Sequence, residues 1–305
     1  MQDQKLYPRT GLSLDKIIAV SFPFLMLYLG YRFGTLSLWS TEGNEIALIV
    51  IAIALSIIGA LRILIIKNKL SYKVEHFLRE FWPIPIVLLG YLAMRFFRID
   101  AVTDMLGILL KDLAIIQLDI MVFGQPLPFY IQHWVSPAMT FLMENAYLHF
   151  YYAMPIGSMI YLAWKENYAT FYRLRVAIIL AMITGWFAYL LVPVEGPIKF
   201  IPEQFAVPLV PSSEVVYGAV ESFRYAYDCF PSLHTAIPWL TLFICWSYYS
   251  HTLKMVALFM TLSITTATLY LRYHYGIDVM AGLFWAIMAW LLTSRIEKRY
   301  QHEPS

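Results

Sequence analysis

The sequence predicts an all-α protein, a polytopic membrane helix bundle with about eight spans. Of its 305 residues, 60% are hydrophobic and only 14% are charged, whereas soluble domains carry about 25% charged residues. A soluble chain of this length would still expose roughly a quarter of its unfolded surface, which is too much for so few polar side chains. The formal net charge of +2 gives no reason to expect a nucleic-acid partner, since such proteins carry a strong basic excess.

Apolar runs of roughly 20 residues are long enough to cross a bilayer as helices. The predicted spans are residues 17–38, 45–66, 81–98, 137–163, 174–194, 231–250, 253–272 and 275–294. The N-terminus ahead of them is polar, and the first run is long enough to span, so we expect no cleavable signal peptide. The last three spans are divided only by short polar breaks near His251 and His274.

Two longer segments connect the spans. Residues 99–136 carry Asp104, Lys111, Asp112 and Asp119 on one helical face, with Leu106, Leu109, Leu113 and Ile116 on the other. This pattern predicts a helix lying in the membrane interface. Residues 195–230 form a loop with four prolines and five acidic residues, and loops of this length are usually functional or disordered.

The distribution of Lys and Arg predicts the orientation in the membrane. With the N-terminus inside, alternating spans place 14 of the 22 basic residues on the inner side and seven outside, with Arg62 within a span. The positive-inside rule favours this arrangement over its inverse. We therefore expect an integral membrane protein with both termini in the cytoplasm.

Ionisable residues near span ends are candidate functional groups, because membrane helices tolerate them poorly. They gather in three motifs, which are VPVEGPIKF with Glu195 and Lys199, DCFPSLHTA with Ser232 and His234, and LYLRYHYGIDVMAG with Arg272, His274 and Asp278. The alternation of spans puts all three motifs on the non-cytoplasmic face. Three clusters that are distant in sequence therefore share one membrane depth, which indicates a site.

The residue types in these motifs fit phosphate chemistry. His274 and Asp278 are four residues apart and would share a helical face, where the carboxylate fixes the tautomer and raises the basicity of the other ring nitrogen. His274 is then a candidate nucleophile and His234 a general acid and base. Ser232 and the free amides of a helix N-terminus would bind an anion. Alone, the pair His274 and Asp278 is equally consistent with a structural ion pair. A metal site is disfavoured, since two histidines and one aspartate lack regularly spaced companion ligands.

The motif PSLHT, followed about forty residues later by HYGID, resembles the last two motifs of the type 2 phosphatidic acid phosphatase superfamily. The run TLYLRYHYGIDVMAG is most similar to the aureobasidin-sensitive inositol phosphorylceramide synthase branch, and LDIMVFGQPLPFYIQ resembles a preamble of that branch. The resemblance implies a six-helix core over about 137–294. It divides the chain into an N-terminal membrane extension, 1–136, and a catalytic helix-bundle core, 137–305.

The resemblance also implies roles for the site residues. His274 would form a phosphohistidine with Asp278 as its partner, His234 would protonate the leaving alcohol, Ser232 would bind phosphate, and no metal or cofactor is expected. The chain departs from the phosphatase pattern, because it has no Arg-Pro dipeptide and carries Thr268 where the last motif has an arginine. The phosphate ligands would then come from Arg272, Lys199 or Arg224. These losses are shared with the lipid phosphotransferase branch and favour transfer over hydrolysis.

A further polar set, Glu144, Asn145 and His149, interrupts the apolar span 137–163. One interpretation is a hydrogen-bond network between helices. The other is a polar wall that recognises the head group or the acceptor, with Glu144 and His149 binding substrate.

Together these features predict a lipid phosphotransferase that moves a phospho-head group, with phosphoinositol as the expected group, from a phospholipid donor to a lipid-alcohol acceptor. The alternative enzyme is a lipid phosphate or diphosphate phosphatase, since a covalent intermediate leaves the acceptor open. A transporter with a site at the membrane midplane is disfavoured, because the histidines lie at span ends. Nothing in the sequence indicates an oligomeric state.

Overall fold

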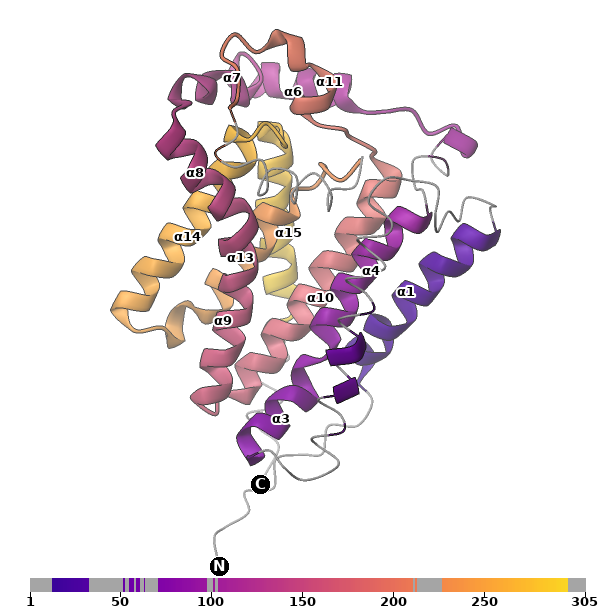
Figure 1. The fold of residues 1–305 in the computed structure, drawn as a ribbon, viewed down its shortest axis with the longest axis vertical. Coiled ribbons are helices and arrows are strands. Elements are labelled where there is room, and N and C mark those ends of the chain that lie inside the picture. The colour runs from indigo at the N-terminus through magenta and orange to yellow at the C-terminus, as the bar shows by residue number, and fades with distance from the viewer. Residues whose placement is uncertain are drawn as a thin grey trace, which may run out of the picture.

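The computed structural model describes residues 13–32, 71–97, 101, 104–210, 212 and 227–295, with scattered positions between 52 and 63. Within these residues the fold is helical and contains no strand; Val194 and Asp228 form one isolated β-bridge. The long helices stand side by side, and shorter ones lie across one end of the bundle (Figure 1). The prediction of an all-α helix bundle is confirmed.

In chain order, the helices of the described residues are α1 (Leu14–Arg32), α3 (Tyr72–Phe81), α4 (Pro83–Phe97), α6 (Asp112–Phe123), α7 (Leu127–Ile131), α8 (Pro137–Asn145), α9 (Tyr151–Trp164), α10 (Tyr168–Leu191), α11 (Pro197–Phe200), α13 (Leu233–Cys245), α14 (His251–Tyr270) and α15 (Gly276–Leu292). A π-helical turn, Ala146–Phe150, joins α8 to α9, so one helical rod covers nearly the whole predicted span 137–163.

Three of the described helices, α1, α10 and α14, are long and apolar enough to cross a membrane. Helix α15 is apolar but shorter, and α6 with the segment Leu127–Trp134 passes the same test only as a pair bent by 63°. The predicted span 45–66 lies mostly outside the described residues. The membrane character is therefore supported, and the number of eight spans stays a prediction.

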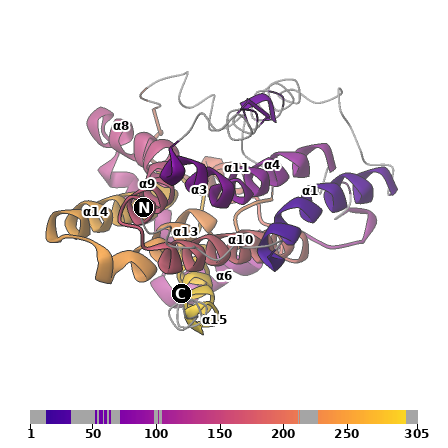
Figure 2. The same ribbon diagram turned by 90° about the horizontal axis from the view of Figure 1, so that it is seen from below.

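Helix α13 occupies the middle of the bundle and packs against α9, α10, α14 and α15 (Figure 2). Its contact with α15 is close, because a Cβ atom added to Gly282 would lie 2.3 Å from the carbonyl oxygen of Ser232. Only glycine permits this approach. The start of α13 and the first turns of α15 are thus held together directly, and both carry predicted site residues.

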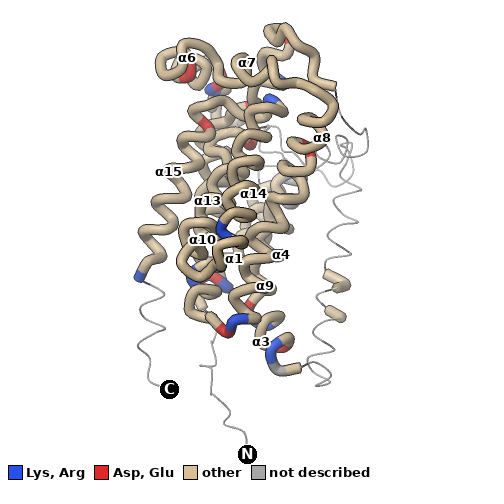
Figure 3. Tube along the Cα trace, turned by 90° about the vertical axis from the view of Figure 1, so that its left-hand side faces the viewer, with Lys and Arg blue, Asp and Glu red and all other residues tan. Residues whose placement is uncertain are grey.

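A buried charged network fixes the end of the bundle at which α10 begins. Arg175 donates from Nε to Asp15 at 2.8 Å and from a terminal nitrogen to Glu80 at 2.5 Å, and Lys16 lies 3.0 Å from the same glutamate. Arg173 donates to the carbonyl oxygen of Trp290 at 3.1 Å. The start of α1 and the end of α15 therefore lie at the same end of the bundle, and Figure 3 shows Lys, Arg, Asp and Glu positions along the trace at this end and at the opposite one.

The helix predicted within 99–136 is present as α6, and its polar face is turned toward the protein. The side chains of Asp112 and Asp119 are fully buried, while Leu113 is 65% and Met121 is 79% exposed. Helix α6 lies across the end of the bundle (Figures 1 and 3) and points its carboxylates inward. The physical reason is that those carboxylates accept backbone N–H groups at a helix start, which have no partner within their own helix.

Candidate active site

The three motifs predicted to meet do lie at one end of the bundle, opposite the Arg175 network. The backbone N–H of Ile198 donates to the carbonyl oxygen of Arg272 at 2.8 Å, which joins the first motif to the third. The N–H of Ser232 donates to the carbonyl oxygen of Asp278 at 3.1 Å, which joins the second to the third. Residues far apart in sequence thus form one continuous structure.

Gly196 makes the junction between two of these motifs possible. Its φ of +88° is favourable only for glycine, and an added Cβ atom would lie 2.4 Å from the carbonyl oxygen of Tyr273. The turn after α10 therefore passes directly behind the residue before His274. A side chain at this position would displace the histidine segment.

His274 and Asp278 face each other, with Nδ1 3.6 Å from Oδ2, a distance within ion-pair range and too long for a good hydrogen bond. The expectation that both residues sit on one helix was wrong, because α15 begins only at Gly276. His274 lies in the preceding turn, and Oδ2 of Asp278 accepts the N–H of Tyr275 at 2.8 Å. The Asp278 carboxylate thus caps the N-terminus of its own helix and also lies next to the imidazole ring of His274.

His234 is held between two tyrosine rings. Its ring centroid lies 3.9 Å from that of Tyr147 and 4.0 Å from that of Tyr151, with interplanar angles of 10° and 29°. The π-helical turn widens the helix at this point and presents both tyrosines to the histidine. Neither ring is among the candidate residues that the sequence indicates, although the two tyrosines are four residues apart, because tyrosines are common throughout this chain.

Ser232 occupies the N-cap of α13 and is fully buried. Its Oγ accepts from the backbone N–H of Thr235 at 3.3 Å and from the hydroxyl of the same residue at 3.2 Å. Both bonds use lone pairs of the oxygen, so neither uses the hydroxyl proton of Ser232. The residue stands at a helix N-terminus of the kind that binds anions.

The candidate basic ligands differ sharply in their surroundings. Arg272 has a φ of +63°, is nearly buried, donates to the carbonyl oxygen of Val207 and lies 4.0 Å over the ring of Phe205. Burial lowers the pKa of Arg272, and its Nε has no hydrogen-bond partner among the described residues. Lys199 is exposed on α11, and Arg224 lies outside the described residues.

Glu144 fastens the loop 195–230 over this end of the bundle. Its carboxylate is 2% exposed and accepts the backbone N–H of Ser212 at 3.1 Å, together with the hydroxyl of that serine. Asn145 donates to the carbonyl oxygen of Phe141 in its own helix at 2.7 Å. His149 is exposed, and the contacts of the described residues do not join it to either candidate histidine. Among the described contacts, Glu144 is the one of the three polar residues that reaches the loop.

Asp119 supports the turn that carries His274. Its Oδ1 accepts the N–H of Ile277 at 2.7 Å, and its Oδ2 accepts those of Gly276 at 2.9 Å and Leu127 at 3.0 Å. Two of these donors are the first amides of α15. The sequence signal was the spacing of the aspartates along one face of 99–136, although that spacing does not reveal which side the protein occupies.

Asp112 acts in the same way on the neighbouring turn. Its oxygens accept the N–H groups of Glu195 and Gly196, both at 3.0 Å, and the hydroxyl of Tyr275 at 3.1 Å. Burial raises the pKa of Asp112, while these hydrogen bonds lower it. Burial and the nearby Asp112 carboxylate likewise raise the pKa of Glu195. Two carboxylates on α6 thus hold the backbone on both sides of the histidine turn.

Comparison with known families covers most of this arrangement, although Asp112 lies just before the matched segment. A family model described as the PAP2 superfamily matches residues 114–292, which is more than half of the chain. The chain belongs to the PAP2 superfamily. No curated protein and no solved structure matches it significantly.

The PAP2 match begins inside α6 and ends with the last residue of α15. It therefore contains His234, His274 and Asp278, and also Asp119. PAP2 membership assigns the protein to lipid phosphatase or phosphotransferase chemistry. Among the described residues, no group of three His, Cys, Asp or Glu side chains is placed to hold a metal ion.

Proposed function

We propose that this PAP2 protein is a metal-independent lipid phosphotransferase. It transfers a phospho-head group, with phosphoinositol as the favoured group and ceramide as the favoured acceptor class, between two membrane lipids. The observation that carries the proposal is the placement of His274, backed by Asp278, at the same end of the bundle as the ring-stacked His234.

In the first step, Nε2 of His274 attacks the phosphorus of the donor, and the bond from phosphorus to the diacylglycerol oxygen breaks. His234 gives a ring proton to that oxygen, so the diacylglycerol leaves as a neutral alcohol. The phospho-head group is then covalently bound to His274. The 3.6 Å approach of Nδ1 to Asp278 supports Nε2 as the nucleophile, because a carboxylate beside one ring nitrogen favours attack by the other.

In the second step, the hydroxyl oxygen of the acceptor attacks the same phosphorus and gives its proton to His234. The bond between phosphorus and Nε2 of His274 breaks, and both histidines return to their starting states. The lipid product carries the head group on its former hydroxyl. With water in place of the acceptor, the same two steps give a phosphatase, which is the alternative function.

The negative charge of the phosphate is balanced by protein groups in this proposal. Arg272 supplies a guanidinium, the start of α13 supplies free amides and a positive dipole end, and Ser232 supplies a hydroxyl, with Lys199 nearby on α11. Thr268 does not replace the missing arginine, because its buried hydroxyl donates to Thr265 and its carbonyl oxygen accepts the N–H of His274. Turnover is therefore expected to survive an excess of chelator.

The proposed sidedness puts the site on the non-cytoplasmic face and both termini in the cytoplasm. The excess of Lys and Arg in the inner segments supports this orientation. The start of α1 and the end of α15 lie at one end of the bundle, and the histidines lie at the other. This arrangement agrees with an even number of membrane crossings, which would place both termini on the same side.

The deciding experiment is a product assay with purified protein and a radiolabelled phosphoinositol donor, with and without ceramide. The proposal predicts a new labelled lipid that appears only with the acceptor. Labelled head group released into water without a new lipid would favour the phosphatase. Activity that is lost in chelator and restored by Mg²⁺ would contradict the metal-independent mechanism.

A further inference from the structure

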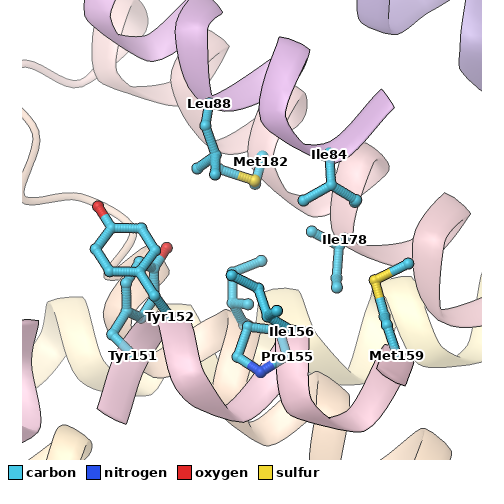
Figure 4. Close-up of a pocket in the computed structure, with 10 residues that line it drawn as sticks. Ile84, Leu88, Tyr151, Tyr152, Pro155, Ile156, Met159, Ile178 and Met182 are labelled. Atoms are coloured by element: carbon cyan, nitrogen blue, oxygen red, sulfur yellow. The ribbon is translucent and has the colours of Figure 1, made fainter. Parts of the chain in front are cut away.

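A partly open apolar cavity lies next to Tyr151, one of the two tyrosines that stack on His234. It lies between α4, α9, α10 and α13, and its empty space is about 360 Å³ when the part open to the outside is counted (Figure 4). Its ten lining side chains include no charged group, and the hydroxyls of Tyr151 and Tyr152 are their only oxygen atoms. Apolar cavities do not hold ordered water well, so this lining fits a hydrocarbon ligand.

Two residues connect the cavity to the catalytic end. Tyr151 lines the cavity and also stacks on the ring of His234 at 4.0 Å. Ile237 lines it from α13, three residues after the histidine and so on the same helical face. A ligand that fills the cavity therefore contacts Tyr151, which in turn contacts His234.

We propose that this cavity binds one hydrocarbon chain of the phospholipid donor. The proposal rests on the proposed function, in which His234 protonates the oxygen of the leaving diacylglycerol. Because the chains of that diacylglycerol are attached a few bonds from the protonated oxygen, one of them must start close to His234. The cavity is an apolar space that reaches Tyr151, the residue stacked on this histidine.

One wall of the cavity lies outside the superfamily match. Ile84 and Leu88 belong to α4, whereas the PAP2 model covers only residues 114–292. Helix α4 is tied to the catalytic end by Tyr91, whose hydroxyl donates to Asp228 at 2.5 Å. The segment matched by the PAP2 model thus supplies the histidines. Helix α4, which lies N-terminal to that segment, helps select the lipid chain.

Substitution of Ile156 by tryptophan tests the proposal, because this side chain points into the cavity (Figure 4). The matched control is Ile160→Trp, the same change one turn along α9 at a position that is 52% exposed and outside the cavity lining. Each variant is assayed with two donors of identical head group, one with long acyl chains and one water-soluble donor with four-carbon chains.

We expect Ile156→Trp to lower kcat/KM at least tenfold for the long-chain donor and less than twofold for the short-chain donor. Ile160→Trp should change neither value more than twofold. Equal losses for both donors in Ile156→Trp, or no loss for either, would overturn the proposal. The short-chain result also reports whether the tryptophan has disturbed the fold or the histidine.

A photoreactive donor gives a readout that does not depend on turnover. A phospholipid with a diazirine near the end of one acyl chain should label wild-type peptides that contain Ile84, Leu88 or Met159, and Ile156→Trp should lose this labelling. Labelling confined to the outer, exposed face of α9 would overturn the chain site. Absence of transfer by the wild-type protein from either donor would instead contradict the proposed function, and the labelling would still test the cavity.

Discussion

The carboxylate of Asp119 offers the sharpest test of how the site is held together. It is fully buried and accepts three backbone N–H groups, two of them at the start of α15. In Asp119→Asn one oxygen becomes an NH₂ group that faces an N–H donor. At least one hydrogen bond to a charged acceptor is lost, which costs about 1.5–3 kcal/mol and corresponds to roughly a 10- to 150-fold larger open population of that turn.

The assay has two parts, and the control is Asp104→Asn, the same change at an exposed position of the same segment. Hydrogen exchange at the amides of Gly276 and Ile277 should accelerate by about 10- to 150-fold in Asp119→Asn and not in the control. The single-turnover rate of phosphohistidine formation should fall at least tenfold with little change in donor affinity, because His274 lies two residues before α15. Normal exchange at both amides together with a normal single-turnover rate would refute the reasoning.

The remaining predictions concern other parts of the molecule. His234→Ala should slow phosphoenzyme formation from a lipid donor but leave its rate nearly unchanged with a nitrophenyl ester, whose leaving group needs no proton. Equal losses of this rate for both donors in rapid-quench assays would contradict the role of His234 as the acid. Glu144→Gln should speed proteolysis of the loop 195–230 without changing donor preference. The control Glu203→Gln, at an exposed site in that loop, should leave the rate of proteolysis unchanged. A changed donor preference in Glu144→Gln would favour head-group recognition by Glu144. Burial lowers the pKa of His76, so its contribution to stability is present above pH 6.5 and is lost as the pH falls through the lowered pKa. The melting temperature should therefore fall between pH 7.5 and 5.5 by more in wild type than in His76→Gln, and equal slopes would contradict this. Glu203→Cys should react with an impermeant thiol reagent added outside intact cells, whereas wild type, whose two cysteines are buried, should not; labelling only after permeabilisation would reverse the orientation.

Helix positions near the site could be predicted because apolar length and capping residues agree there. The predicted spans 253–272 and 275–294 differ by only one or two residues from α14 and α15. Ser250 caps α14 by accepting the N–H of Leu253, which is the local chemistry that a serine before an apolar run indicates. The pairing of His274 with Asp278 was predicted as well, although the helix between them starts later than expected.

The direction in which α6 faces could not be predicted from its periodicity. A period of 3.6 separates the two faces of a helix but does not reveal which one meets water. In a soluble protein the polar face would be outside, whereas here Asp112 and Asp119 find backbone donors inside, and the exposed side is apolar. The division of the chain between residues 136 and 137 stays a prediction. The hydrogen bonds from Asp119 on α6 to the start of α15 show that residues N-terminal to this division support the turn that carries His274.

The sandwich around His234 also escaped prediction, for a different reason. It depends on the π-helical turn Ala146–Phe150, and such a turn has no residue signature comparable to a glycine or a proline. The pairing of Arg175 with Asp15 and Glu80 was equally hidden. The count of basic residues placed Arg175 at the inner end, but it contained no information about a partner 160 residues away.

Ionisable residues within a membrane protein are treated by default as functional, and this chain shows what must be added to that rule. At the end of the bundle where α10 begins, Arg175 and Lys16 meet Asp15 and Glu80 in three ion pairs, so charge is balanced within the protein. At the end that carries the histidines, the carboxylates of Asp112 and Asp119 accept neutral N–H groups, and Arg272 donates to a neutral carbonyl oxygen. Among the described residues, these charged groups are held by backbone dipoles and form no ion pair with one another. The buried carboxylates near the histidines are thus held by backbone N–H groups, whereas those at the other end are held by basic side chains, and this difference in partner separates the two buried clusters.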